Sequence, residues 1–370
     1  MKLTHLWLRD ETKPDEKRTA LTPAAIKALL DAGMKVTVEE SQNRAIPTNE
    51  YQTTGCEITP SQNWKNAPKD AHILGLKELL DEDEPLTHKH IYFAHAFKKQ
   101  DGWQKLMKRF NSGGGSLYDL EYLTDEKGKR VVAFGHWAGF VGCALAIHSW
   151  AHQITHFNDG KHVPIPPVKP FENEKKLVEF VKQELDIALA KTQKSPPKTL
   201  IMGKGGRCAT GAFDFLQKSQ LDSLCAQWGK EDTAKGGPFE EILEFDVFVN
   251  CVLITNKTPP FLTFETLQKP RNLSIISDVS CDPTGPYNPL PIYPSITHFA
   301  NPAHIIDAGE NNNPPLDLIA IDHLPSALPR ESTEDFSIQL LPHLLELQQK
   351  ESAVFQRAFE LFEKTKNEAC

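Results

Sequence analysis

A glycine-rich turn lies past the middle of the chain, between two apolar stretches. The apolar residues 199–202 end at Gly203, and Gly205, Gly206, Arg207 and Cys208 precede the return of apolar residues. Glycine has no Cβ and tolerates positive φ, so backbone N–H groups and the positive end of a helix dipole can approach a pyrophosphate there. The order predicts a strand, a tight turn and a helix start that bind a dinucleotide, with Cys208 in the slot of the third glycine of the G-x-G-x-x-G pattern.

Polar side chains follow three apolar runs in the first 130 residues. Lys77, His95 and Glu121 each come directly after such a run. The carboxyl ends of parallel strands border the ligand crevice of an open α/β sheet, so we expect these side chains to face one cavity. A lysine and a histidine suit general acid–base chemistry there, provided that burial or neighbouring cations lower the pKa of the lysine toward the working pH.

The loop at residues 11–23 is unusually polar and contains Glu16 and Arg18. A charged loop is most often a solvated turn, and that interpretation stays open. Together with Arg130, the loop instead suggests a pocket with two guanidinium groups for carboxylates. Arginine suits that task because its planar fork binds a carboxylate through two hydrogen bonds.

The elements that must position these residues follow from periodicity and capping signals. Thr22 is a suitable N-cap and Pro23 a suitable first residue for a helix that extends to residue 32. Repeated strand and helix patterns imply parallel sheets. Strands are predicted at residues 3–8, 36–38, 71–76, 90–94, 116–120, 199–202, 245–252 and 273–280.

Three further helical patterns carry expectations about packing. Residues 133–147 are rich in glycine and alanine, which is typical of a helix packed closely between domains, and residues 172–191 form a charged helical pattern. The tail is helical apart from a predicted break at Pro342. Three aromatic residues of this tail should pack on the first domain: Phe355, Phe359 and Phe362.

Composition narrows the class of partner and the compartment. The net charge of −8 gives no overall basic surface, which argues against nucleic acid or an anionic membrane as the main partner and favours a small molecule. No apolar run is long enough to span a bilayer, and the N-terminus lacks the apolar segment of a signal peptide, so we expect a cytoplasmic protein. The seven cysteines include no CxxC pair, which favours reduced thiols, and the sequence predicts no metal site.

Several motifs together carry a resemblance that covers essentially the whole chain. In combination they resemble the NAD-dependent, L-lysine-forming saccharopine dehydrogenases. Alanine dehydrogenases and the nucleotide-binding subunit of transhydrogenase share only the start of the first motif and the two-domain plan. The motifs are Glu11–Pro23, Gly75–Glu78, Phe93–His95, Leu117–Glu121, Arg130 with Ala133–Gly135, Ala138–Phe140, Gly206–Cys208, Gly236–Phe239 and Ile321–Ser326.

The resemblance implies reversible oxidative deamination of saccharopine to L-lysine and 2-oxoglutarate, a step of lysine biosynthesis, with NAD as the hydride acceptor. Lys77 would take the proton from the secondary amine, and His95 would act as acid and base while water adds and the carbinolamine collapses. Arg18 and Arg130 would hold carboxylates of the glutarate part. The remaining substrate-binding residues would be Glu16, Glu78, Gln100, Glu121 and Asp322.

The cofactor-binding set extends beyond the glycine turn. In the family pattern an aspartate follows the tryptophan at the end of the second strand of this domain, but here Gly229 follows. Either Glu231 or Asp232 replaces it at the ribose and NAD is kept, or Lys230 and Lys204 accept a 2′-phosphate; we favour NAD. The full predicted set is Gly203, Gly205, Gly206, Arg207, Cys208, Glu231, Asp232, Cys251, Asp278, Val279, Ser280, His323 and Leu324.

Two cysteines of that set suggest a redox liability. Cys208 opens a predicted helix and Cys251 ends a predicted core strand, so both should border the nucleotide and could form a disulfide that blocks it. Two inert thiols that only pack the nucleotide loop are the alternative.

The predicted fold class is α/β, with two Rossmann-like domains, parallel sheets and an inter-domain active-site cleft on the alanine-dehydrogenase plan. The catalytic and substrate domain is predicted at residues 1–132 plus 326–370, and the dinucleotide-binding domain at 133–325. The oligomeric state is expected to be a monomer or a small homo-oligomer. Two rival functions remain: an alanine-dehydrogenase-like oxidoreductase and a catalytically silent nucleotide sensor, the second disfavoured by intact Lys77 and His95.

Overall fold

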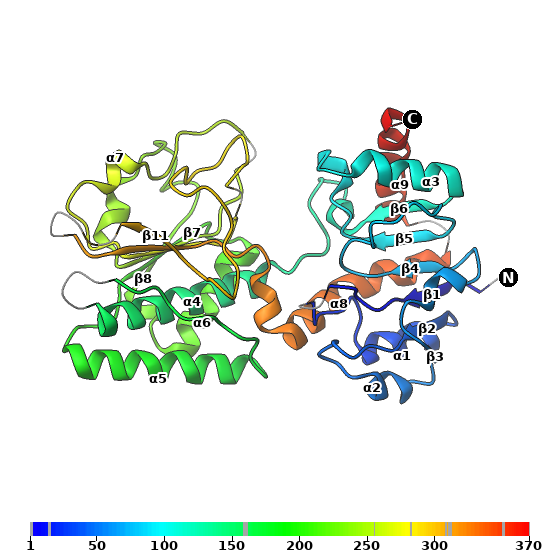
Figure 1. The fold of residues 1–370 in the computed structure, drawn as a ribbon, viewed down its shortest axis with the longest axis horizontal. Helices are drawn as coiled ribbons and strands as arrows, with labels where there is room; N and C mark the ends of the chain where they lie inside the picture. Colours follow the sequence, from blue (N-terminus) through cyan, green and yellow to red (C-terminus); the bar gives the residue numbers. More distant parts are fainter. Residues whose placement is uncertain are drawn as a thin grey trace. The chain divides into compact units, whose positions relative to one another are not determined.

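The computed structural model describes residues 3–13, 16–157, 162–254, 256–281, 283–307, 309, 313–349 and 352–369. Pro14 and Asp15 of the polar loop lie outside these ranges. The chain divides into two compact units, Met1–Phe134 with Pro329–Cys370 and Gly135–Leu328. Each unit contains one six-stranded, mainly parallel sheet with helices (Figure 1), so the predicted α/β plan is confirmed.

The first unit has the strand order β3-β2-β1-β4-β5-β6, and every neighbouring pair is parallel. Its strands are β1 His5–Leu8, β2 Lys35–Glu39, β3 Glu57–Thr59, β4 His72–Leu74, β5 Lys89–Tyr92 and β6 Ser116–Asp119. Its helices are α1 Pro23–Asp31, α2 Thr48–Gln52, α3 Trp103–Gly113, α8 Pro329–Glu346 and α9 Ala353–Ala369, with short 3-10 turns η1 Asn63–Asn66, η2 Ala96–Lys98, η3 Leu120–Tyr122 and η7 Leu347–Gln349.

Helix α1 begins where its capping signal predicts. The Thr22 side chain accepts a hydrogen bond from the Ala25 N–H at 3.2 Å, and Pro23 opens the first turn. Ile26 and Leu29 are fully buried, so the apolar stripe of the helix packs into the core of this unit. Gly33 follows with φ +83°, which allows the chain to turn into β2.

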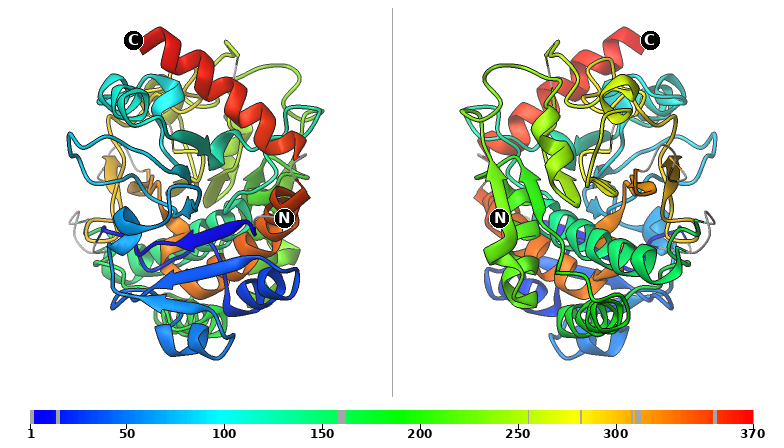
Figure 2. Two further views of the ribbon diagram at one scale, coloured as in Figure 1. Left: turned by 90° about the vertical axis from the view of Figure 1, so that its right-hand side faces the viewer. Right: turned by 90° about the vertical axis from the view of Figure 1, so that its left-hand side faces the viewer.

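The C-terminal helices complete the first unit. The ring of Phe355 lies 5.5 Å from that of Tyr118, and the ring of Phe362 lies 5.4 Å from that of Phe110, so the predicted packing of the tail is confirmed. Helix α9 (Figure 2, left) runs obliquely past the strands of this unit.

The predicted break at Pro342 is wrong, because α8 continues through it to Glu346. Proline removes the donor to the carbonyl four residues earlier, that of Ile338. Ile338 is 72% exposed, so water can satisfy this carbonyl and the helix tolerates the proline.

The second unit has the order β11-β12-β10-β9-β7-β8, and only β11 is antiparallel to its neighbour. Its strands are β7 Thr199–Met202, β8 Cys225–Trp228, β9 Val247–Asn250, β10 Ile275–Asp278, β11 His304–Asp307 and β12 Leu316–Ile319. Its helices are α4 Gly135–His156, α5 Glu174–Thr192, α6 Arg207–Ser219 and α7 Phe264–Leu267, with short turns η4 Asp222–Leu224, η5 Glu240–Glu244 and η6 Leu324–Ala327. Helices α4, α5 and α6 lie on one side of the sheet in Figure 1.

The small residues of α4 serve packing inside this unit. A Cβ on Gly139 would lie 1.8 Å from the carbonyl oxygen of Cys208, and one on Gly211 would lie 1.8 Å from that of His136. Only glycine permits α4 and α6 to cross this closely. Gly135 and Gly139 of α4 face α6 of the same unit, and Gly142 faces Val279 and Leu324. The expectation of a helix packed between domains stays a prediction.

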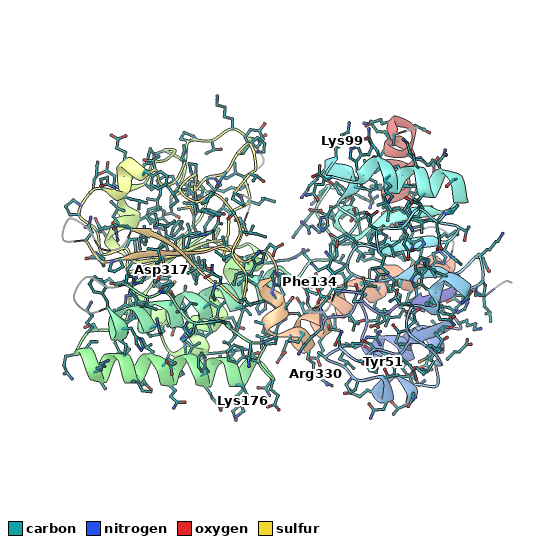
Figure 3. The ribbon with its side chains drawn as sticks, viewed as in Figure 1. Tyr51, Lys99, Phe134, Lys176, Asp317 and Arg330 are labelled. Atoms are coloured by element: carbon teal, nitrogen blue, oxygen red, sulfur yellow. The ribbon has the colours of Figure 1, made fainter. Side chains whose placement is uncertain are left out.

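One buried polar pair of the second unit joins β12 to the segment before α5. Asp317 of β12 (labelled in Figure 3) is buried and lies 2.6 Å from Nε2 of His162. Among the residues that the structure describes, no helix has the length and apolar character needed to cross a bilayer. In the same ranges, no group of three or more His, Cys, Asp or Glu side chains is arranged to hold a metal ion.

Candidate active site

The parallel order β4-β5-β6 brings three predicted site residues to one edge of the first sheet. Lys77 follows β4, His95 follows β5, and Glu121 lies in η3 directly after β6. Their strands pair in parallel register, so their carboxyl ends are neighbours. The side chains of His95 and Glu121 are in contact. That all three side chains face one cavity stays a prediction.

His95 lies between two carboxylates. Its Nε2 is 3.6 Å from Oε1 of Glu78, and its Nδ1 is 3.7 Å from Oε2 of Glu121. The backbone of His95 is left-handed, with φ 54°, a conformation that non-glycine residues seldom adopt and that is concentrated at functional sites. The side chain is 35% exposed, so the imidazole can reach both a ligand and water.

Glu121 is the most strongly ionised acid of this edge. Its oxygens lie 2.9 Å from Nζ of Lys98 and 3.7 Å from Nη2 of Arg130. Its interaction with His95 and these two cations lower the pKa of Glu121 to about 2. The carboxylate therefore remains charged at every working pH.

Asp119, which the sequence analysis did not assign to the site, supports this arrangement from below. It is fully buried and accepts hydrogen bonds from the N–H groups of Ala94, at 3.3 Å, and Glu121, at 2.9 Å. Burial raises the pKa of Asp119 to about 6. One buried carboxyl thus links the turns that carry His95 and Glu121. Its signals in the sequence were its position at the end of a strand and its place within the Leu117–Glu121 motif.

Glu78 faces the same space and is balanced by a cation of the polar loop. Although burial acts to raise its pKa, the ion pair of its Oε2 with Nζ of Lys13, at 2.6 Å, leaves the pKa of Glu78 below the ordinary value. A cavity of about 420 Å³ is lined by Glu78, His95 and the exposed Gln100, among others. Three predicted substrate or catalytic residues therefore share one hollow within the first unit.

Arg18 and Glu16 are paired with each other. Glu16 accepts from Nε of Arg18 at 2.8 Å and from Nη2 at 2.6 Å, and both side chains are about 5% exposed or less. The guanidinium also lies 4.5 Å from the ring centroid of Phe134. The two-pronged edge that the sequence analysis reserved for a substrate carboxylate is occupied in this structure by Glu16, a carboxylate of the chain itself.

Lys77 is half-buried, and its positive charge acts on the pKa of Glu16. Burial raises the pKa of Glu16, but Arg18 first and Lys77 to a lesser extent more than offset this, so the pKa of Glu16 lies below its ordinary value. The main chain of Lys77 contacts the buried pair of Arg9 and Glu11. Sequence reasoning missed Arg9 altogether and noted Glu11 only as part of a motif.

The glycine turn of the second unit has the predicted conformation. Gly203 and Gly205 have φ of +111° and +84°, and the N–H groups of Gly203 and Lys204 both donate to the carbonyl of Trp228, at 2.9 and 3.0 Å. Gly206 is the N-cap of α6 and supplies no capping side chain. A Cβ on Gly205 would have no protein atom within 4 Å, so the open space beside this turn suits a close-fitting ligand.

The turn after β8 shows how the departure at Gly229 is accommodated. Asp232 Oδ2 accepts a hydrogen bond from the N–H of Gly229 at 2.7 Å. The carboxylate of Asp232 therefore lies beside the position where the family pattern has its acid. Glu231 is exposed, and only its backbone carbonyl has a contact within this turn, with the N–H of Ala234. The arrangement favours Asp232 over Glu231 as the replacement.

Cys208 and Cys251 are not joined to each other, so the hypothesised disulfide is not formed in this structure. Burial raises the pKa of the Cys251 thiol well above its ordinary value, and a charge on Cys208 would raise it further. The Cys251 thiol is therefore poorly suited to ionise, which weighs against the redox liability.

The remaining predicted cofactor residues differ in their burial and in their hydrogen bonds. Asp278 is buried, with Oδ1 and Oδ2 accepting from Asn250 and Tyr293 at 2.9 and 2.7 Å. Ser280 donates to the carbonyl of Val252 at 2.7 Å. These hydrogen bonds hold the loop after β10. Of the other predicted cofactor residues, Val279 donates its N–H to the Asn250 carbonyl, and Leu324 is buried.

Asp322 belongs to the second unit and contacts its neighbour there. Its Oδ1 lies 2.6 Å from Nδ1 of His323, which also packs edge-to-face on Phe299. Arg207 and Cys208 are both half-buried at the start of α6.

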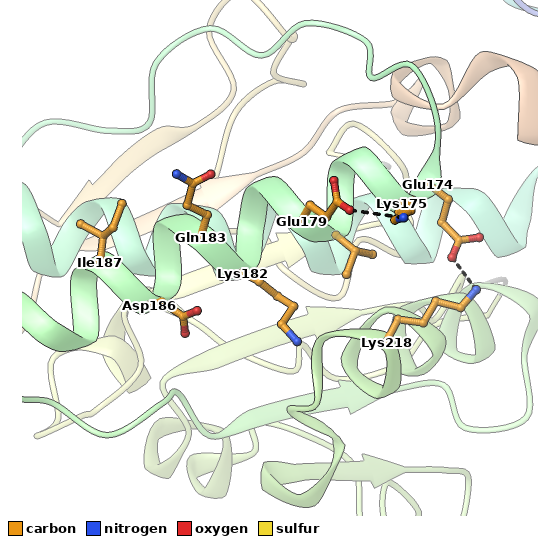
Figure 4. Close-up of a pocket in the computed structure, with 9 residues that line it drawn as sticks. Glu174, Lys175, Glu179, Lys182, Gln183, Asp186, Ile187 and Lys218 are labelled. Carbon is orange, nitrogen blue, oxygen red and sulfur yellow. Dashed lines mark ion pairs between the residues drawn. The ribbon is translucent and has the colours of Figure 1, made fainter.

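A separate groove between α5 and α6 contains none of the predicted site residues. It has a volume of about 690 Å³ and is lined largely by charged side chains, including the paired Glu174 and Lys218 (Figure 4). Its ion pairs are ordinary surface pairs.

The comparisons with known proteins agree with this geometry. Residues 7–141 match the family model "Alanine dehydrogenase/PNT, N-terminal domain". A saccharopine dehydrogenase [NAD(+), L-lysine-forming] of Schizosaccharomyces pombe is 47% identical over 97% of this chain and 97% of that protein. One of Emericella nidulans with the same description is 47% identical over 96% of each. A solved L-alanine dehydrogenase is similar in fold, with a TM-score of 0.65 at 15% identity over 98% of this chain and 94% of that one.

Proposed function

Because this chain belongs to the family of NAD(+)-dependent, L-lysine-forming saccharopine dehydrogenases, we propose that it oxidises the CH–NH bond of saccharopine and releases L-lysine and 2-oxoglutarate. The observation that carries the proposal is 47% identity over nearly the full length of both chains. The alanine dehydrogenase is only 15% identical, so that likeness supports the fold and not its substrate.

The reaction consumes one water and transfers one hydride. Bound NAD supplies the acceptor for the hydride that leaves the amine-bearing carbon. The secondary amine must lose its proton, water must then add to the resulting C=N bond, and the C–N bond of the adduct must break with proton return to the departing amine. The protein has to provide groups that accept and donate these protons in turn.

We propose that Lys77 accepts the proton of the secondary amine and that His95 moves protons during the hydration and cleavage steps. The contacts of His95 support its part, since an imidazole between Glu78 and Glu121 can carry a proton and release it. The role of Lys77 is supported by its position after the end of β4. It is also supported by its positive charge, which helps to lower the pKa of Glu16.

The substrate is a tricarboxylate with an amino group, and the first unit offers matching charges. We propose that Arg18 and Arg130 bind glutarate carboxylates, and that Glu78 and Glu121 bind the amino group. For Arg18 this requires that an arriving carboxylate share or replace Glu16. Three residues remain assigned to the substrate with less support: Glu16, Gln100 and Asp322.

The glycine turn supports NAD as the cofactor. We propose that the backbone around Gly203, Gly205 and Gly206 holds the pyrophosphate and that Asp232 binds the adenosine ribose. A carboxylate beside Gly229 repels a 2′-phosphate, which favours NAD over NADP. Location in the cytoplasm and the oligomeric state stay predictions.

One spectrophotometric assay tests the function. Purified protein is given saccharopine or L-alanine with NAD or NADP, and formation of the reduced nicotinamide is followed. We expect turnover with saccharopine and NAD only. Turnover with alanine, or NAD binding without turnover of either substrate, would support one of the two rival functions instead.

A further inference from the structure

The backbone of Lys77 is held from both sides by one buried ion pair. Glu11 accepts hydrogen bonds from the N–H groups of Leu76, on Oε1 at 2.7 Å, and Lys77, on Oε2 at 2.9 Å. Arg9 Nη2 donates to the carbonyl oxygen of Lys77. Both polar groups of the Lys77 main chain are therefore bound by the side chains of a different strand end.

Arg9 and Glu11 form a close, buried ion pair that is tied to the ends of β1 and β4. Nη1 of Arg9 lies 3.4 Å from Oε2 of Glu11, and the two side chains are 1% and 6% exposed. Arg9 follows β1, and its own N–H donates to the Leu74 carbonyl at 2.9 Å. Because β1 and β4 are neighbours in the sheet, the pair fixes the point at which the chain leaves β4.

The space around Arg9 is shaped for this contact. A Cβ on Gly75 would lie 2.3 Å from Nε of Arg9 and 2.4 Å from its Cζ. Gly75 therefore lets the guanidinium lie directly against the β4 exit. A buried ion pair is costly unless further hydrogen bonds satisfy it, and here those bonds are made to the backbone of residues 76 and 77.

We infer that Arg9 and Glu11 are positioning residues for Lys77: the buried pair sets the main-chain orientation from which the lysine amine reaches the substrate. This inference rests on the role of Lys77 given under the proposed function. A misplacement of about 1 Å at a reacting group can cost up to about a hundredfold in rate, so weakening the pair should reduce turnover without touching the substrate.

The kinetic test compares Glu11→Gln in two backgrounds. Glutamine keeps the shape but loses the charge and one acceptor, so kcat should fall about tenfold while KM for NAD stays within about twofold. In the Lys77→Met background the same change should alter the residual turnover by less than about twofold, because the group it positions is gone. An equal loss in both backgrounds would show a general structural effect and overturn the inference.

A second variant and a matched control guard against misfolding. Arg9→Lys keeps the charge but cannot span the same contacts, and should lower kcat in the same way. Arg44→Lys is the control, since Arg44 is also buried in the first unit and donates to a backbone carbonyl, that of Glu39, at 3.2 Å. It should leave kcat unchanged. A similar loss in Arg44→Lys would also overturn the inference.

A measurement independent of turnover separates this inference from the proposed function. The full-length protein is reductively methylated with ¹³C-formaldehyde, and the Lys77 resonance is assigned by its loss in Lys77→Arg. Glu11→Gln and Arg9→Lys should shift or broaden that resonance, and Arg44→Lys should not. An unchanged Lys77 resonance in both folded variants would overturn the positioning role, whereas absence of wild-type turnover would overturn only the function.

Discussion

The carboxyl edges of the two sheets differ in the chemical groups that form them. In the first unit the edge is made of side chains: His95 lies between two carboxylates, and Glu121 is surrounded by cations. In the second unit it is made of backbone: Gly203 and Gly205 turn with positive φ, and the first turn of α6 has no side-chain cap. We therefore propose proton chemistry at the first edge and anion binding at the second.

The two edges should therefore tolerate different kinds of substitution. An edge made of ionisable groups depends on charge and geometry, so conservative substitutions there alter turnover more than binding. An edge made of glycine backbone depends on the absence of Cβ atoms, so even a methyl group alters binding. Of the four predictions below, three test this division and one concerns the stability of both units.

The largest effect is expected from the side-chain edge. Replacing Lys77 by Met and His95 by Gln together removes both proton-transfer groups, so kcat for saccharopine should fall by a factor of about 10² or more. Titration calorimetry should show NAD affinity within about twofold of the wild type. Lys89→Met is the control, because Lys89 begins β5 at its amino end. Near-normal turnover in the double variant would remove both assignments.

Acid should destabilise both units through buried neutral histidines. Burial lowers the pKa of His72, in β4, to about 4, and that of His148, in α4, to about 4. The unfolded chain takes up a proton below about pH 6.5 and the folded protein does not, so stability falls with pH through the window from 6.5 to 4. From pH 6.5 to 5 each histidine should cost about 2 kcal/mol.

Urea titrations at the two pH values check this. His72→Gln should flatten the pH dependence of the free energy of unfolding of the first unit, and His148→Gln that of the second. An unchanged slope in either variant would show that its histidine titrates normally in the folded state. His304→Gln, which replaces a half-buried histidine of the second unit, serves as the control.

At the backbone edge a single methyl group should weaken NAD binding. Gly205→Ala is expected to raise Kd for NAD about tenfold, because the new Cβ projects into space free of protein atoms where the ligand would lie. Gly55→Ala is closely matched: its φ is +83° against +84°, and a Cβ there also meets no atom within 4 Å. Both should lose similar stability, about 1 to 3 kcal/mol from backbone strain, and only Gly205→Ala should lose affinity.

The smallest effect concerns the ribose. Asp232→Asn should raise Kd for NAD a few-fold and improve the ratio of NADP to NAD in kcat/KM, because the carboxylate beside Gly229 is neutralised. Glu231→Gln should change neither quantity. If Glu231→Gln has the larger effect, the replacement acid is Glu231, and if wild type already prefers NADP, neither acid binds the ribose.

Local sequence determined the elements and the residues at their ends. Thr22 and Pro23 mark the start of α1, and the glycine turn marks the start of α6, because caps and φ preferences act between covalent neighbours. The apolar runs before Lys77 and His95 likewise indicated strand ends. The family motifs then extended these local signals to function.

Other features were decided only when the strands took their places. Glu11 meets Lys77 across 66 residues, and Glu16 occupies the fork of Arg18, which no periodicity indicates. Two glycines of α4 meet α6 because of how two helices cross on one sheet, and Pro342 is tolerated because its face of α8 is exposed. Sequence pattern reports a residue's own backbone and burial, whereas partners far along the chain depend on strand order and register, which the fold as a whole selects.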